Sequence, residues 1–237
     1  MAAPRVMPYM RGGTGEAPYR LNIQEVLKIT DEQGNFNLKR PIQVAMDEEG
    51  NIYVLDDGIS QILKFGPQGC FLKSLVKKGE GPGEVYYMQS MLVTHRHLIV
   101  NNGYPAKMIF FDHNGMVTHE YKLRGEASIR MVAYDGQAFF GLESMFPREK
   151  INQGYLNVEQ KLVLFSPRQQ DKRVVFSFPI RRYYVRRGGA RGMFAMARML
   201  YSASMKHHCI WISHTDEYNI KCIDLKSGKT KYRIARD

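Results

Sequence analysis

The sequence predicts an all-β protein, a β-propeller of four-stranded antiparallel blades, with about four blades in this chain. Two observations predict this fold. Residues 41–76 form a pattern of four short β-rich runs joined by turn residues, which is typical of an antiparallel meander. Part of this pattern recurs three more times along the chain, and repeats of this kind indicate stacked blades, because a single meander cannot bury both of its faces.

The first blade sets the pattern. Its four runs are rich in β-branched and aromatic residues, which favour strands. Aspartate and glycine separate the first three runs, and Gly66, Pro67 and Gly69 predict a turn before the fourth, because proline presets φ and glycine accepts a positive φ. The predicted strands are 42–46, 52–55, 62–65 and 71–75.

The third strand and its turn identify the copies. The segment 62–69 (ILKFGPQG) is matched by 108–115 (MIFFDHNG), 162–169 (LVLFSPRQ) and 220–228 (IKCIDLKSG). The intervals are about 46, 54 and 58 residues, near the length of a propeller repeat of four strands. The predicted blades are 41–76, 88–123, 128–178 and 194–234. The alternative is a β-sandwich whose strands resemble one another by chance. The repeated strand–turn–strand pattern disfavours this alternative.

The N-terminal part predicts a lead-in and a closing strand. Residues 1–22 have no hydrophobic period and are predicted to be flexible. Residues 23–29 (IQEVLKI) alternate well enough to predict a strand that completes the last blade, with a short helix as the alternative. The start of the chain lacks the plan of a secretory signal, and no apolar run is long enough to span a bilayer. The sequence therefore predicts no particular cellular compartment.

The three cysteines do not form a disulfide framework. Cys209 and Cys222 would face each other if a tight hairpin joined their strands, and two buried thiols are the alternative. His95 and His97 are predicted to be exposed turn residues, because no carboxylate or cysteine beside them completes a metal site. No metal, cofactor or catalytic residue is predicted.

The net charge of +11 indicates either a solvated basic surface or attraction to polyanions or an acidic partner. The most unusual segment is 179–193 (PIRRYYVRRGGARGM), which we expect to be a long connection between blades. Arginine pairs with carboxylates and phosphates, and tyrosine offers a ring for stacking. The alternative is a solvated connection without a ligand. The candidate binding residues are Arg181, Arg182, Tyr183, Tyr184, Arg186, Arg187 and Arg191.

Three segments are predicted to open on one face, because connections from strand two to three and from blade to blade leave a meander at the same end. They are the glycine-rich connection 77–87, the insertion 143–160 and the arginine-rich segment 179–193. The first lacks the ending of a phosphate loop and is predicted to be a tight connection. Long loops on a regular scaffold often carry binding specificity. We call this the predicted loop face.

The segment GNIYVLDDGISQILKFGPQGCFLKSL resembles the NHL-type repeat of six-bladed β-propellers, and KKGEGPGE after it resembles a bacterial group related to TolB-type propellers. The resemblance implies six blades, so the chain is expected to be part of a six-bladed propeller. It also implies an exported origin, since members of that group are often exported.

The predicted function is a non-catalytic binding or scaffold propeller that recognises a protein or other acidic partner through the loop face. A metal-dependent propeller hydrolase or lyase is one alternative, and an RNA-binding propeller is another. The hydrolase needs carboxylates on the innermost strands. Those strands instead offer Gln43, Gln89, Arg130 and Arg198. No RNA-binding motif is present, although the charge permits nucleic-acid binding.

Overall fold

The structure is a computed structural model. It describes residues 5–6, 24–30, 34–123, 129–145, 153–169, 171–187, 190–195, 199–204, 208–214 and 217–235. These residues form strands, turns and irregular segments, and none of them lies in a helix. The prediction of an all-β protein with antiparallel four-stranded blades is therefore confirmed.

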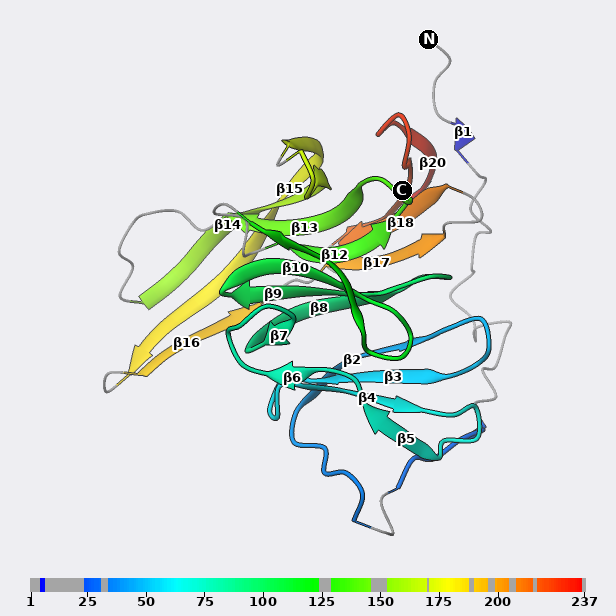
Figure 1. Cartoon of the computed structure of the whole chain (residues 1–237). Helices are drawn as coiled ribbons and strands as arrows, with labels where there is room; N and C mark the ends of the chain where they lie inside the picture. The colour runs from blue at the N-terminus through cyan, green and yellow to red at the C-terminus, as the bar shows by residue number, and fades with distance from the viewer. Residues whose placement is uncertain are drawn as a thin grey trace. The chain divides into compact units, whose positions relative to one another are not determined.

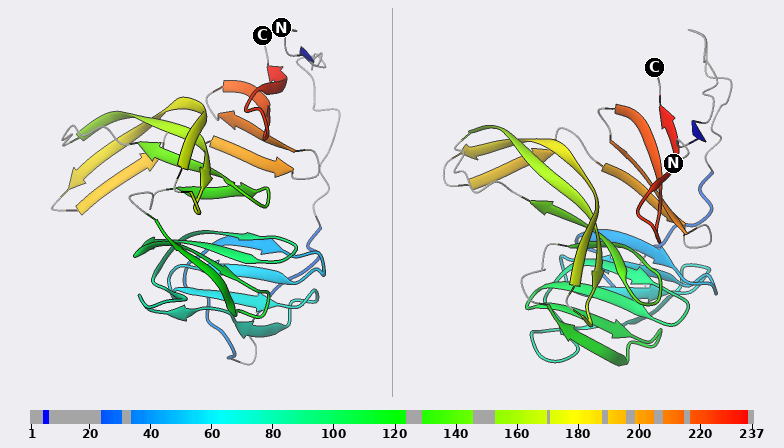
Figure 2. Two further views of the ribbon diagram at one scale, coloured as in Figure 1. Left: turned by 45° about the horizontal axis from the view of Figure 1, so that its top comes forward. Right: turned by 90° about the horizontal axis from the view of Figure 1, so that it is seen from above.

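The chain divides into two compact units (Figures 1 and 2). The first unit comprises residues 19–134 and 166–171. The second unit comprises residues 1–18, 135–165 and 172–237.

The first unit contains two complete blades, each a four-stranded antiparallel sheet in which neighbours along the chain pair (Figure 1). Blade 1 consists of β2 (Pro41–Met46), β3 (Ile52–Asp56), β4 (Gln61–Phe65) and β5 (Phe71–Ser74). Blade 2 consists of β8 (Tyr87–Val93), β9 (Leu98–Tyr104), β10 (Ala106–Phe111) and β11 (Val117–Lys122). Between the two blades, β6 (Lys77–Lys78) pairs in parallel with β7 (Glu84–Val85).

The turns form where the sequence predicts them. In blade 1, the Gly69 N–H donates to the Gly66 carbonyl at 2.9 Å, and Gly69 has a φ of 80°. In blade 2, Gly115 takes the equivalent place with a φ of 88°. A Cβ on Gly115 would lie 2.6 Å from the Leu75 carbonyl oxygen, so this turn requires glycine for space as well as for conformation.

The main core of the first unit lies between the two blades. It includes Tyr53, Leu55 and Ile62 from blade 1 and Met91 and Leu98 from blade 2, all of them almost fully buried. Because side chains alternate along a strand, Ala45 of β2 packs on this core. Its neighbours Ile42, Val44 and Met46 are exposed.

The opposite face of blade 1 is covered by the irregular segment before β2. Phe36 packs edge-on against Phe65 at a centroid distance of 5.0 Å, and Ile29 contacts the same cluster. The prediction of a strand over 23–29 is therefore wrong for the described residues 24–30, which form no strand. Leu27 and Ile29 lie against blade 1 next to Gly69, whereas Val26 is exposed.

Two further sheets have five strands each. The first has the strand order β12-β13-β14-β15-β16. The second runs β1-β20-β19-β18-β17, in which β1 (Arg5–Val6) pairs in parallel with β20. An added strand thus comes from within the predicted lead-in 1–22. The bounds are Arg130–Tyr134 for β12, Phe139–Met145 for β13, Gln153–Ser166 for β14, Asp171–Arg187 for β15, Ala190–Ala195 for β16, Met199–Ser204 for β17, Cys209–His214 for β18, Glu217–Asp224 for β19 and Thr230–Ala235 for β20.

The arginine-rich segment is not a loop. Strand β15 is 17 residues long and runs through Tyr183, Tyr184 and Val185, after which β16 returns antiparallel to it. Tyrosine and valine favour strands, and the long neighbour β14 supplies the hydrogen-bonding partner that an isolated segment lacks. The third blade therefore extends through β16, beyond the predicted end at 178.

Candidate binding surface

The glycine-rich connection of the predicted loop face is tightly bound to its surroundings. The Gly79 N–H donates to the Val85 carbonyl at 2.8 Å, and the Gly81 N–H donates to the Glu84 carboxylate at 3.1 Å. The Gly83 N–H donates to the carboxylate of Glu120 at 2.6 Å. Carboxylates thus occupy the N–H groups that a phosphate would need, so this segment is a connection and not a phosphate loop.

A buried amide fixes the end of this connection. Asn102 is fully buried, and its Oδ1 accepts the N–H groups of Tyr86 and Tyr87, both at 3.0 Å. Its Nδ2 donates to the carbonyls of Tyr104 and Pro105, both at 2.7 Å. The Ser60 hydroxyl donates to the Tyr86 carbonyl at 2.9 Å. The Asn102 side chain therefore positions both the start of β8 and the end of β9.

This end of blade 2 presents aromatic rings and positive charge. Tyr86, Tyr87 and Tyr104 are 48%, 49% and 61% exposed. Lys77 and Lys78 of β6 are exposed, and the Lys78 ammonium lies 5.6 Å from the ring centroid of Tyr86. Exposed tyrosines with cations beside them are the residue types expected of a surface that binds a polar, acidic partner.

In the second unit, the structure brings two of the predicted segments together. The described parts of the insertion, 143–145 and 153–160, are the extended ends of β13 and β14, with Met145 opposite Glu159. Strand β14 lies next to β15, and the rings of Tyr155 and Tyr183 make an edge contact at 5.1 Å. The insertion and the arginine-rich hairpin are therefore neighbours in one sheet (Figure 2).

The candidate arginines are placed by their backbone. Arg181, Arg182, Tyr184, Arg186 and Arg187 lie on β15, and Arg191 lies on β16. Arg186 is directly opposite Arg191 in the register. The side chains of these six residues lie outside the described part of the structure.

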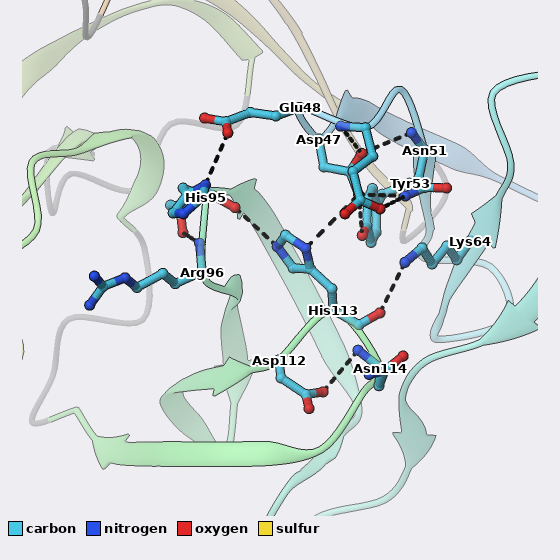
Figure 3. A network of polar contacts seen from close by, with 12 residues as sticks. Asp47, Glu48, Asn51, Tyr53, Lys64, His95, Arg96, Asp112, His113 and Asn114 are labelled. Atoms are coloured by element: carbon cyan, nitrogen blue, oxygen red, sulfur yellow. Dashed lines mark hydrogen bonds and ion pairs between the residues drawn. The ribbon is translucent and has the colours of Figure 1, made fainter.

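A polar network that sequence reasoning missed lies at the opposite end of the first two blades, among the turns from strand one to two and from strand three to four (Figure 3). The Asp47 carboxylate accepts the Asn51 backbone N–H at 2.8 Å and the Tyr53 hydroxyl at 2.9 Å. His113 of the next blade lies 3.9 Å from it, and its Nε2 is 3.0 Å from the Thr94 carbonyl. Burial alone would raise the pKa of Asp47, but the hydrogen bonds from Asn51 and Tyr53 outweigh it and hold the pKa below its usual value.

The two predicted turn histidines differ in environment. His95 is exposed, as expected, and pairs with Glu48 at 2.9 Å. His97 is partly buried, with its ring edge-on to Phe110 at 5.7 Å, while His119 approaches the same Phe110 ring at 6.2 Å. Burial lowers the pKa of His97, and the nearby His119, Arg96 and His113 lower it further. The proximity of these residues has no local sequence signal, because they come from two hairpins.

This environment predicts a loss of stability in mild acid. A histidine of lowered pKa binds protons more weakly in the folded state than in the unfolded state, so stability is full at neutral pH and falls as the pH drops below about 6.5. Replacing His97 by Gln removes this titration and should reduce the difference in unfolding free energy between pH 7.5 and pH 5.5. Urea unfolding at both pH values measures this difference in unfolding free energy. His95→Gln is the matched control, and an equal reduction in both variants would contradict the prediction.

The polar residues of the innermost strands connect blades. The Gln43 amide of β2 accepts the Met91 N–H at 2.9 Å and donates to the Met91 carbonyl at 2.7 Å, and so joins blade 1 to β8. The Ser90 hydroxyl likewise accepts the Met131 N–H at 3.0 Å. Arg130 is exposed, and Arg198 lies outside the described residues. Within the described ranges, no group of three or more His, Cys, Asp or Glu residues is placed to hold a metal ion.

The cysteine pair lies diagonally across two strands of the second unit. Cys209 is opposite Asp224 and Cys222 is opposite Trp211, so the two cysteines are not directly opposed. Both are buried free thiols. Burial, together with the neighbouring Cys209, raises the pKa of the Cys222 thiol to about 11.

A comparison with protein-family models decides the family. Residues 29–177 match the family DUF5128, described as a 6-bladed beta-propeller. The chain belongs to this family. The match confirms the six-bladed propeller class, but names neither the NHL nor the TolB-type group. A comparison with curated proteins found no match.

Several solved structures are similar to this chain at low sequence identity. A Bacteroides fragilis protein, named as exported, is 14% identical with a TM-score of 0.57 over 88% of this chain and 54% of its own. A DUF4221 family member from Bacteroides vulgatus is 12% identical, with a TM-score of 0.48 over 82% of this chain and 57% of its own. The extracellular domain of a two-component system from B. thetaiotaomicron is 10% identical, with a TM-score of 0.42 over 82% of this chain and 29% of its own. The chain thus spans about half the length of the first two.

Within the part of the chain that the structure describes, no helix is long and apolar enough to cross a bilayer.

Proposed function

We propose that this propeller is a non-catalytic binding module that recognises an acidic partner through the connections at one end of its blades. The observation that carries the proposal is the end of blade 2, where the buried Asn102 fixes the backbone of exposed tyrosines and the Lys78 ammonium lies near the Tyr86 ring. A surface fixed before binding loses little conformational freedom on association, which favours affinity.

The arginine-rich hairpin supports the same chemistry. Arg186 and Arg191 occupy directly opposed positions on β15 and β16. Like charges at opposed positions destabilise a strand pair, and an acidic partner would offset that repulsion. The net charge of +11 adds long-range attraction for such a partner.

The proposal is tested with poly-L-glutamate as the probe, by fluorescence titration at low and physiological salt. The variant Lys77→Ala with Lys78→Ala should weaken binding about tenfold, because each exposed cation contributes up to roughly 1 kcal/mol near a polyanion. Replacing the five hairpin arginines by alanine should weaken it at least as much.

The control variant, Lys226→Ala with Lys229→Ala, removes the same charge from two exposed positions near the turn between β19 and β20. Equal loss in the control and the test variants would show attraction to net charge alone and overturn the proposed surface. Preferential, salt-steep binding of unrelated single-stranded RNAs would favour the RNA-binding alternative instead.

We also propose an exported origin. The Bacteroides fragilis neighbour is named as exported. It shares only the fold with this chain, so its name supports the origin as a proposal.

A further inference from the structure

We propose that blade 2 carries a subsite for a saccharide ring, so that the acidic partner is an acidic polysaccharide. The subsite, called here the tyrosine platform, consists of Tyr87, Tyr104 and the amide of Gln89. This inference rests on the proposed function, because it names the class of the acidic partner.

The two tyrosines of the platform come together because of the strand register at the end of blade 2. Tyr87 of β8 lies directly opposite Tyr104 of β9, and opposed residues of an antiparallel pair point to the same face. The residue beside them is Gly103, where a Cβ would lie 2.9 Å from Cδ1 of Tyr87. The Tyr87 ring therefore lies close over bare backbone, while about half of its surface remains exposed.

Gln89 adds a hydrogen-bonding group to this surface. The strand register shifts between Met88 and Ser90, so Gln89 is the extra residue of a β-bulge, a feature that redirects a side chain. Its Oε1 lies 3.4 Å from Nδ2 of Asn101. Its Nε2 would be 2.7 Å from a Cβ on Gly103, so this donor lies next to the Tyr87 ring.

This combination matches the chemistry of a sugar. A saccharide ring has an apolar face of C–H groups, which pack on an aromatic ring, and an edge of hydroxyls, which bond to amides and phenols. Tyrosine offers both a ring and a hydroxyl with little loss of conformational entropy. The lysine beside Tyr86 supplies a cation for a carboxylate on the same polymer.

A peptide partner fits this end of the blade less well. Peptides commonly pair through their main chain with exposed N–H and C=O groups of a strand. Here Asn102 occupies the N–H groups of Tyr86 and Tyr87 and the carbonyls of Tyr104 and Pro105. Ser60 occupies the Tyr86 carbonyl. This surface therefore offers a partner mostly side chains and few free backbone groups. Recognition of a saccharide uses such side-chain contacts.

The test compares polygalacturonate, a polymer of acidic sugars, with poly-L-glutamate, which carries the same charge type without sugar rings. Isothermal titration of the whole chain at physiological salt should show tighter binding of polygalacturonate. Tyr87→Ala and Tyr104→Ala should each weaken polygalacturonate binding about tenfold, the loss of one ring contact. Neither change should alter poly-L-glutamate binding. Tyr→Phe at the same positions, which keeps the ring, should retain most of the affinity.

Tyr232→Ala is the matched control, because Tyr232 is an exposed tyrosine on β20 of the other unit. Thermal melts of each variant check that the fold is intact. Equal affinity for both polymers, or tyrosine variants that bind polygalacturonate normally, would overturn the saccharide subsite and leave the proposed function standing. Failure of both polymers to bind would overturn the proposed function as well.

Discussion

Replacing Asp56 by alanine is expected to lower the free energy of unfolding by about 3–5 kcal/mol, among the largest effects of any single change in the first unit. Asp56 is fully buried at the end of β3. Its Oδ2 accepts the Lys39 N–H at 2.7 Å, and its Oδ1 accepts the N–H groups of Arg40 at 2.9 Å and Gly58 at 2.9 Å. Alanine would leave these donors without a partner, and an unpaired backbone N–H costs more than a hydrogen bond contributes.

The reason for so large an effect is that Asp56 joins two parts of the chain. It holds the turn after β3 and also the segment that covers the outer face of blade 1, where Phe36 and Ile29 pack. Urea unfolding followed by far-UV circular dichroism measures the loss. Asp56→Asn is the matched variant: its single carbonyl can keep the Oδ1 bonds but not the bond from Lys39, so its loss should be about half as large. A loss below about 1 kcal/mol for alanine would show that these bonds are not cooperative.

Replacing Asn102 by alanine is expected to cost a similar amount, about 3–4 kcal/mol, and to displace the tyrosine platform. Asn102 makes four hydrogen bonds, two as acceptor and two as donor, at a fully buried position. Alanine leaves all four backbone groups without their partner. Tyr86, Tyr87 and Tyr104 would lose the hydrogen bonds that fix their backbone. The affinity for polygalacturonate should therefore fall together with the free energy of unfolding.

Asn102→Asp separates the two halves of this amide. The carboxylate can still accept from Tyr86 and Tyr87 but places negative charge against the carbonyls of Tyr104 and Pro105, so it should also be strongly destabilising. Asn114→Ala is the control, because Asn114 is an exposed turn residue, and its change should stay within about 0.5 kcal/mol. Similar losses of unfolding free energy in Asn102→Ala and Asn114→Ala would contradict the role given to the Asn102 hydrogen bonds.

Local signals in the sequence were sufficient for the blades of the first unit. The segment 62–69 and its copy 108–115 predict a strand and a turn, and the structure has β4, β10 and the turns ending at Gly69 and Gly115 in those places. Such elements are determined by residues near one another, since turn residues set φ and β-branched runs favour strands whatever lies further along the chain. The family match over 29–177 agrees with that repeat.

Only the tertiary structure showed that the arginine-rich segment is a hairpin and that residues 24–30 are not a strand. A strand needs a neighbouring strand for its backbone hydrogen bonds. Whether β14 is long enough to pair with the end of β15 depends on the insertion, which lies more than 20 residues before that end in the sequence. The tyrosine platform depends on the same kind of long-range fact. Two register shifts that compensate each other leave Tyr87 opposite Tyr104 and make Gln89 the extra residue of a bulge. The sequence by itself does not specify such shifts, which arise from packing and from the amide of Asn102.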